Sequence, residues 1–169
     1  MDIQAIVMQM RSQAQAIGVL AEGWSDEQAR WKPDAASWSV LEVVNHLLDE
    51  EREDFRPRID LVLHRGAEAW APIDPEGWVA AREYNRKEME PSVQEFLEAR
   101  EASLGWLLGL GDEDWSKEYR ASFGTVRAGD LLAAWVAHDL LHMRQLVELK
   151  YAYLARTMEP YALKYAGEW

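Results

Sequence analysis

The sequence predicts an all-α protein folded as a four-helix bundle, with long loops between the helices and a short helix at the C-terminus. Apolar residues recur at steps of three and four through four long segments, and no convincing strand pair or internal repeat interrupts them. The length of 169 residues fits one domain over residues 1–169. A hydrophobic content of 49% indicates a packed core rather than disorder.

The first two helices are predicted from the apolar stripe and from helix-capping residues. The first extends from about Asp2 to Ala21. The second begins near Ser39, an N-cap residue type with Glu42 three positions later, and runs to about His64. Pro57 lies inside this segment and is expected to kink or shorten the helix, because proline lacks the backbone N–H that a helix interior needs.

The remaining segments complete the predicted bundle. Residues 67–80 are rich in Pro and Trp and are expected to form a loop. A third helix is predicted over 81–110, with Pro91 as an alternative start of its main part. The fourth helix is predicted over 127–154, and a short fifth helix over 159–165.

The acidic charge balance excludes several classes of partner. The chain has 18 Lys and Arg against 30 Asp and Glu, a net charge of −12. Nucleic acids and anionic membrane surfaces bind proteins through clustered Lys and Arg, and no basic stripe is present. The expected partner is therefore a small-molecule substrate rather than a nucleic acid or a membrane.

The absence of cysteine restricts the available chemistry. The chain has no Cys, so protein thiolate catalysis, disulfides and Cys-ligated metals are excluded. A transition-metal site must use His, Asp and Glu. The first residues carry no basic, apolar leader pattern and no segment approaches about 20 apolar residues, so we expect a cytoplasmic protein.

Four histidines are the candidate metal ligands: His46, His64, His138 and His142. His138 and His142 are four residues apart on the fourth helix, so their rings lie on one face and could chelate one ion. The glutamate of the HExxH protease motif is missing between them. Two buried histidines bonded to neighbouring polar groups would show the same spacing, and the spacing alone leaves both interpretations open.

His46 lies beside Val43 at the margin of the apolar face of the second helix. Glu42, Glu50 and Glu53 share its side of that helix. If His46 faces the core-side pair on the fourth helix, the three imidazoles form a site open to solvent on one side. An open position is typical of a catalytic rather than a structural metal site.

Other features have more ordinary interpretations. His64 is expected to interact with the C-terminal dipole of the second helix. The acidic run 49–54 is expected to be a solvated helix face. Trp135 is a candidate wall of the pocket because it precedes His138 by one turn, and Gln145 follows His142 closely enough to orient it or to bond to backbone instead.

Two segments resemble the signatures of the DinB-like (YfiT-like) metalloenzyme superfamily. They are Trp38–Leu47, reading WSVLEVVNHL, and Ala137–Leu146, reading AHDLLHMRQL. The resemblance covers nearly the whole chain and implies a four-helix bundle of the DinB/YfiT type. It implies metal binding by His46, His138 and His142, and a homodimer, since many members are dimers. Members with assigned activities include thiol transferases using bacillithiol, mycothiol-dependent isomerases and metal-dependent hydrolases.

These observations lead to a functional hypothesis and its alternatives. Imidazole ligands suit Zn²⁺, Ni²⁺, Fe²⁺ or Cu²⁺, with Zn²⁺ or Ni²⁺ preferred here. The first hypothesis is a metal-dependent transferase that holds a low-molecular-weight thiol as thiolate for attack on an electrophile, with Glu50 as orienting group or general base. Metal-dependent hydrolysis through bound water is the alternative. A non-catalytic, stress-related bundle with a structural metal, or with no metal, remains as the third interpretation.

Overall fold

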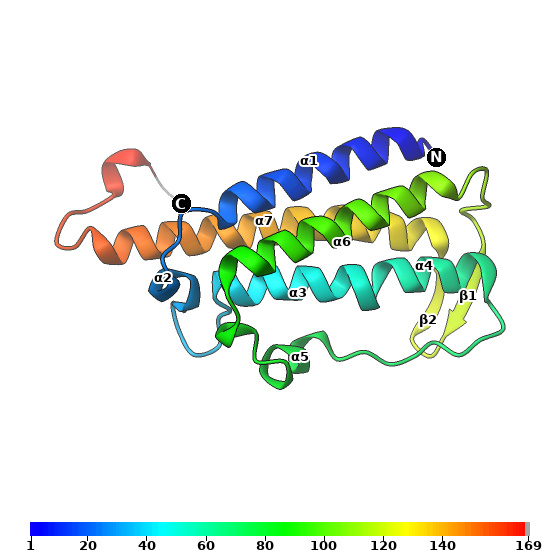
Figure 1. Ribbon diagram of the computed structural model, residues 1–169, viewed down its shortest axis with the longest axis horizontal. Coiled ribbons are helices and arrows are strands. Elements are labelled where there is room, and N and C mark those ends of the chain that lie inside the picture. The colour runs from blue at the N-terminus through cyan, green and yellow to red at the C-terminus, as the bar shows by residue number, and fades with distance from the viewer. Residues whose placement is uncertain (168–169) are drawn as a thin grey trace.

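A computed structural model of the chain describes residues 1–167 and contains four long helical segments. They are α1 (Ile3–Ala21), α3 (Val40–Glu53) continued by α4 (Phe55–His64), α6 (Met89–Gly109) and α7 (Ala128–Thr157), as Figure 1 shows. The predicted all-α bundle is therefore confirmed. In the described part of the chain, no helix combines the length and the apolar content that crossing a membrane requires.

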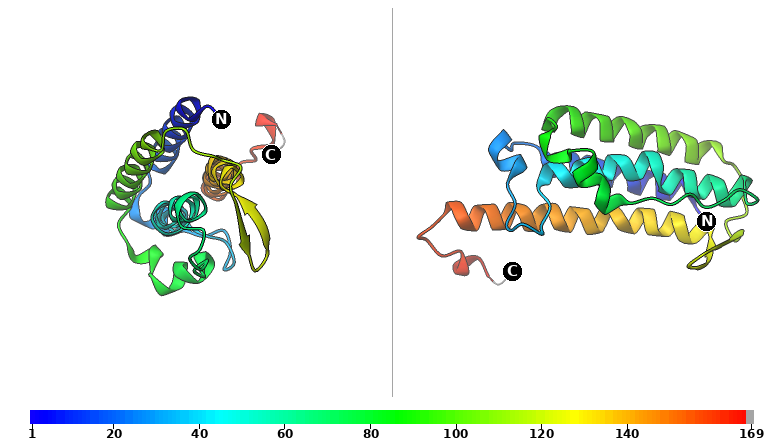
Figure 2. Two further views of the ribbon diagram at one scale, coloured as in Figure 1. Left: turned by 90° about the vertical axis from the view of Figure 1, so that its right-hand side faces the viewer. Right: turned by 90° about the horizontal axis from the view of Figure 1, so that it is seen from below.

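The four segments lie side by side along one long axis (Figures 1 and 2). The α1 helix packs against α6 and α7, while α3 packs mainly against α6, and α4 packs against α7. Each segment thus contacts two neighbours, so each buries the apolar stripe that its sequence pattern predicts.

Two hydrophobic clusters fill the interior at different heights of the bundle. One cluster includes Ile59, Leu104 and Trp135. The other includes Val44 and Leu146. Each cluster takes residues from all four helical segments, so neither forms without the complete bundle.

A buried polar layer separates the two clusters, centred on Arg100 of α6. Arg100 donates from Nε to Glu51 of α3 at 2.7 Å, and from both terminal nitrogens to Asp139 of α7 at 2.7 and 2.8 Å. It also donates to the carbonyl of Met10 in α1, while the Trp135 indole donates to Glu51. The three charged side chains are each no more than 2% exposed. One guanidinium therefore connects all four helical segments.

The second predicted helix is divided in two. Ser39 and Glu42 form the predicted capping box, in which each side chain accepts a bond from the other residue's backbone N–H. The chain leaves helical geometry at Asp54, where φ is −119° and ψ is −87°, so the helix expected over 39–64 is interrupted, but three residues before Pro57 rather than at it. Pro57 lies in the first turn of α4, where a missing N–H costs no internal helical bond.

The connections contain more helix than the sequence indicates. A short helix, α2, covers Asp26–Arg30, and α5 (Pro75–Ala81) and the 3₁₀ turn η1 (Tyr84–Arg86) fall near the boundary between the expected loop and the expected third helix. The third long helix begins at Met89 rather than at 81. At the C-terminus only a 3₁₀ turn, η2 (Lys164–Ala166), is present where a fifth helix was expected over 159–165.

A two-stranded hairpin precedes α7 and corrects the expectation of no strand pair. The strands β1 (Glu118–Ala121) and β2 (Gly124–Arg127) pair antiparallel, with Ala121 opposite Gly124. Gly124 has a φ of 141°, a conformation that residues with a Cβ rarely adopt. The strands are only four residues long and mostly exposed, so they lack the alternating apolar pattern that would have revealed them.

The first half of the acidic run 49–54 is not the solvated face that its composition indicates, although Arg52 and Glu53 are exposed as expected. Asp49, Glu50 and Glu51 are each no more than 6% exposed. Glu51 belongs to the Arg100 layer, and Asp49 accepts hydrogen bonds from Arg82 and the Tyr84 hydroxyl. The burial of Glu51 and Asp49 is possible because these two carboxyls meet basic or hydroxyl partners from elements far away in the sequence.

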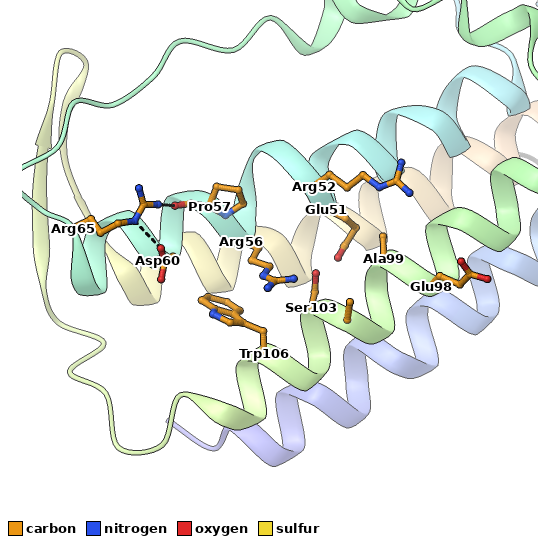
Figure 3. Close-up of a pocket in the computed structure, with 11 residues that line it drawn as sticks. Glu51, Arg52, Arg56, Pro57, Asp60, Arg65, Glu98, Ala99, Ser103 and Trp106 are labelled. Atoms are coloured by element: carbon orange, nitrogen blue, oxygen red, sulfur yellow. Dashed lines mark hydrogen bonds and ion pairs between the residues drawn. The ribbon is translucent and has the colours of Figure 1, made fainter.

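A groove of about 660 Å³ runs between α3–α4 and α6, on the outer side of the Arg100 layer (Figure 3). Its lining includes three arginines, Arg52, Arg56 and Arg65, together with Trp106 and the carboxyl of Glu51. Arg56 lies over the Trp106 ring at 5.5 Å from its centroid. This groove contains none of the three candidate metal ligands.

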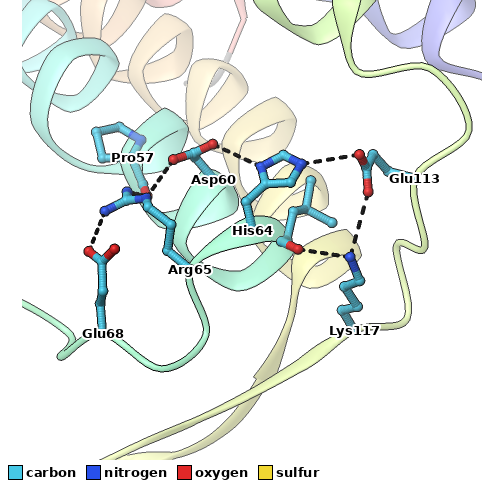
Figure 4. Close-up of polar contacts among 8 residues, drawn as sticks. Pro57, Asp60, His64, Arg65, Glu68, Glu113 and Lys117 are labelled. Atoms are coloured by element: carbon cyan, nitrogen blue, oxygen red, sulfur yellow. Dashed lines mark hydrogen bonds and ion pairs between the residues drawn. The ribbon is translucent and has the colours of Figure 1, made fainter.

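His64 ends α4, as predicted, but its ring nitrogens face carboxylates rather than helix carbonyls (Figure 4). Nδ1 lies 2.9 Å from an Asp60 oxygen, and Nε2 lies 3.1 Å from a Glu113 oxygen. Only the imidazolium carries hydrogens on both nitrogens, and the two carboxylates raise the pKa of His64 accordingly. The residue links α4 to the loop that leads into the hairpin.

Replacing Arg100 by alanine is expected to destabilise the protein by about 3–5 kcal/mol, because Glu51 and Asp139 would stay buried without a cation. Urea unfolding measures the change. Arg11→Ala is the matched control, since Arg11 makes a two-bond ion pair with Glu101 on the exposed surface; its loss should cost at most about 1 kcal/mol. Equal effects of the two substitutions would contradict the role given to the buried layer.

The His64 bridge predicts a defined pH dependence of stability. A raised folded pKa stabilises the protein fully below the unfolded value of about 6.5, and the contribution is lost as pH rises through the folded pKa. The difference in unfolding free energy between wild type and His64→Gln should therefore be largest near about pH 6 and shrink toward about pH 9. Urea titrations of both proteins across this range test it, and a difference that grows with pH would disprove the bridge.

Candidate metal centre

The imidazoles of His46, His138 and His142 converge between α3 and α7. Nε2 of His138 lies 3.4 Å from Nε2 of His46 and 3.1 Å from Nε2 of His142. Ligand atoms of all three residues lie within 4.8 Å of one another. Among the described residues, this is the one group of His, Asp or Glu side chains close enough together to hold a metal ion. Residues 92 positions apart in the chain thus present their ring nitrogens to one point.

The spacing of these nitrogens fits a shared metal ion. Two imidazole nitrogens bound to one ion at about 2.0–2.1 Å lie roughly 2.8–3.4 Å apart for octahedral to tetrahedral angles. The two Nε2–Nε2 separations, 3.1 and 3.4 Å, fall within that range. The donor set of three neutral nitrogens suits a divalent transition metal.

Hydrogen bonds alone cannot satisfy the same contacts. Nδ1 of His142 lies 2.8 Å from the Gln145 side-chain oxygen and so carries the hydrogen, which leaves Nε2 of His142 with a lone pair. Nε2 of His138 could then donate to His142 or accept from His46, but not both. One of the two contacts therefore lacks a hydrogen in either arrangement, whereas a cation would satisfy all three nitrogens. Gln145 fixes the tautomer that leaves Nε2 free for a metal.

Burial keeps the three imidazoles neutral. Burial, reinforced by the other histidines, lowers the pKa of His46 to about 3. Burial and the nearby His142 and Arg100 lower the pKa of His138 to about 3, and burial also lowers the pKa of His142. Neutral imidazole is the form that binds metal, so the site requires no deprotonation at neutral pH.

His46 is more buried than its position on the helix indicates. It is 5% exposed, whereas the two histidines of α7 are half-buried, so the expected margin and core positions are reversed. Aromatic rings pack against the triad: Trp38 lies 4.9 Å from the His46 ring, and Phe55 lies edge-on to His138 at 5.1 Å. These rings restrict the imidazoles to a small set of orientations.

Glu50 follows His46 by one turn of α3 and lies beside it. Its Oε1 is 3.8 Å from Nδ1 of His46, beyond hydrogen-bond distance, and both atoms are buried without a hydrogen-bond partner. Burial, together with the carboxylates of Asp54 and Asp49, raises the pKa of Glu50 to about 8. The predicted site thus includes a carboxyl with unused bonding capacity.

Two cavities reach the triad from different sides. One, of about 530 Å³, is lined by His46 and His138 with Glu50. The other, of about 620 Å³, is lined by His142 and Gln145. Trp38 and Glu76 line both cavities, so they stand between the two approaches to the imidazoles.

The α5 segment forms one wall of the first cavity and is tied to α3 by ion pairs. Arg82 donates to Asp49 at 2.7 Å and to Glu53 at 2.6 Å. The α5 helix itself is capped by Asp74, whose side chain accepts from the Gly77 backbone N–H. These contacts position a wall that sequence analysis had assigned to a loop.

The structure brings together every residue of the predicted triad and places Glu50 and Gln145 against it. Trp135 does not wall the pocket: it is 1% exposed, stacks on Phe55 and bonds to Glu51 in the interior. Trp38, which sequence analysis did not single out, takes that role. Its position directly before the α3 cap, eight residues ahead of His46, was the available signal.

Comparison with known proteins agrees with the fold. The model of the DinB superfamily matches residues 9–146. Among solved structures, the chain is similar to YfiT from Bacillus subtilis, described as a probable metal-dependent hydrolase with an unusual four-helix bundle topology; the TM-score is 0.77, at 19% sequence identity over 92% of this chain and 87% of that one. No curated protein matches the sequence. Since the family model covers most of the chain, the protein belongs to the DinB superfamily.

Proposed function

We propose that the protein is a divalent-metal-dependent enzyme that hydrolyses a small molecule, with His46, His138 and His142 as metal ligands. The convergence of three neutral imidazoles carries the proposal, with two Nε2–Nε2 separations of 3.1 and 3.4 Å and ligand atoms of all three within 4.8 Å. In residues 1–167 the cluster offers three donors, and a site with three protein ligands keeps a position for water or substrate. The probable hydrolase activity given for YfiT supports the same choice.

The chain's own residues would prepare and support the reaction. A bound divalent ion of this type lowers the pKa of a coordinated water and polarises an electrophilic oxygen. Glu50 lies beside His46 in the same cavity, where its carboxyl would orient the imidazole. It would take a proton from an attacking water in its ionised form, which a bound cation favours against the raised pKa of about 8. Gln145 holds His142 in the binding tautomer, and Trp38 and Phe55 exclude water from the ring faces.

Thiol transfer is the second candidate. Two cavities meet at the triad, so a low-molecular-weight thiol and an electrophile could approach from different sides. The electrostatics disfavour the common thiols, because glutathione and bacillithiol carry carboxylates and no Lys or Arg lines either cavity in the described residues. We therefore place hydrolysis first.

Glu50→Gln is the sharpest test of this assignment. The Zn²⁺- and Ni²⁺-loaded proteins would be assayed on chromogenic carboxylic esters, phosphate esters and anilides, with parallel assays of thiol consumption on electrophiles. We expect hydrolysis that disappears with chelator and falls about 10²–10⁴-fold in Glu50→Gln, with metal content retained, because the variant keeps its size and loses its basicity. Glu22→Gln, an exposed change of the same kind, should match wild type.

The result can contradict the proposal in two ways. Hydrolysis unaffected by chelation would remove the metal from the reaction. Consumption of thiol without any hydrolysis would favour the transferase, and inactivity of the fully metal-loaded protein on both substrate classes would favour a non-catalytic bundle.

A further inference from the structure

We propose that the cavity on the His46 side of the triad selects substrates that carry a positively charged ammonium group. This inference deepens the proposed function and rests on it, because a substrate exists only if the protein is an enzyme. The binding preference itself does not depend on turnover. The surfaces that contact the triad, and not the chain's net charge, carry the inference.

The first observation is the charge of the cavity wall. Four carboxyl side chains line the cavity, from Glu50, Asp54, Asp74 and Glu76, and no Lys or Arg lines it in the described residues. Arg58, which is outside the lining, pairs with Asp54 at 2.8 Å and offsets part of its charge. Asp74 and Glu76 are exposed, so they set the potential that an approaching ligand meets first.

The second observation is a buried carboxyl at the cavity wall. Glu50 lines the cavity but is only 4% exposed, and its Oε1 is buried without a hydrogen-bond partner. A buried carboxyl with an unpaired oxygen is costly, and a cationic ligand held beside Glu50 offsets that cost. A substituted ammonium supplies such a charge, which the acidic wall also favours.

The third observation is the aromatic wall. Trp38 and Phe55 both line this cavity. The faces of aromatic rings attract cations, and the effect grows when the cation is shielded from water. Carboxylates and aromatic rings on one wall are a combination that recognises an organic cation rather than an anion.

The positive side chains of this part of the bundle gather elsewhere. The groove between α3–α4 and α6 is lined by Arg52, Arg56 and Arg65 (Figure 3). Arg82, which anchors α5, forms ion pairs with Asp49 and Glu53. Acidic and basic residues therefore line different cavities, on different sides of α3. The negative charge of the triad cavity comes from its own lining and not from the net charge of the chain.

Three probes of similar size and different charge test the preference: benzylammonium, benzyl alcohol and benzoate. Their binding would be measured by ligand-observed NMR and calorimetry on the full chain, both Zn²⁺-loaded and metal-depleted, at low and high salt. We expect benzylammonium to bind the metal-depleted protein about tenfold more tightly than benzyl alcohol, with the preference weakened by salt and by the charge of bound Zn²⁺. Benzoate should be the weakest of the three on the metal-depleted protein, where no ion can hold its carboxylate.

Variants locate the preference. The double variant Asp74→Asn with Glu76→Gln removes two exposed charges, and asparagine retains the ability to cap α5. We expect it to lose about two-thirds or more of the benzylammonium affinity while the affinity for benzyl alcohol stays unchanged. The control is Glu22→Gln with Asp112→Asn, an equal change of charge on exposed residues outside both cavities. It should keep the wild-type preference.

The outcomes separate this inference from the proposed function. Equal affinity for the three probes on metal-depleted protein, or equal loss in both double variants, would overturn the cation preference. Zn²⁺-dependent hydrolysis at the same rate for esters with ammonium, neutral and carboxylate substituents would also overturn it while supporting a hydrolase. A clear benzylammonium preference without turnover of any ester would support the inference and count against the hydrolase.

Discussion

The buried guanidinium of Arg100 is the interaction on which the geometry of the site depends. It binds Glu51 on α3 and Asp139 on α7, and each of these residues is the sequence neighbour of a residue at the candidate centre, Glu50 and His138. Buried apolar surfaces tolerate sliding, whereas a two-bond ion pair in the interior has one low-energy arrangement. We infer that this layer fixes the register of α3 against α7 and so sets His46 opposite the histidine pair.

The chemistry of the site then depends on which side chains are buried and on the hydrogen-bond partners they have. Burial keeps the imidazoles neutral, and Gln145 sets the tautomer of His142. Glu50 lies beside them with a free acceptor atom. No Lys or Arg lines the cavity beside its carboxyl groups in the described residues. The nearby Arg82 and Arg100 form ion pairs with other carboxylates, Asp49 and Asp139. Structural and candidate functional carboxyls therefore alternate along one short stretch of α3.

Sequence analysis anticipated the helices and the triad because both leave periodic signals. The apolar stripe defined α1 and α7 closely, and the i, i+4 spacing identified the face of His138 and His142. The burial of Glu51 and Asp49 was missed since it depends on Arg100 and Arg82, which are distant in sequence. The short hairpin and α5 were missed since four to seven residues carry too little pattern. Trp38 lies next to the α3 cap in the sequence, but its contact with the His46 ring depends on tertiary packing.

The central claim is that three imidazoles share one divalent ion. X-ray absorption spectroscopy of the Zn²⁺- or Ni²⁺-loaded protein, purified without a histidine tag, counts imidazole ligands directly. The structure predicts one bound ion per chain with three imidazole ligands, and two imidazole ligands in His46→Ala. Failure of the wild-type protein to bind the metal, or an unchanged imidazole count in His46→Ala, would contradict it.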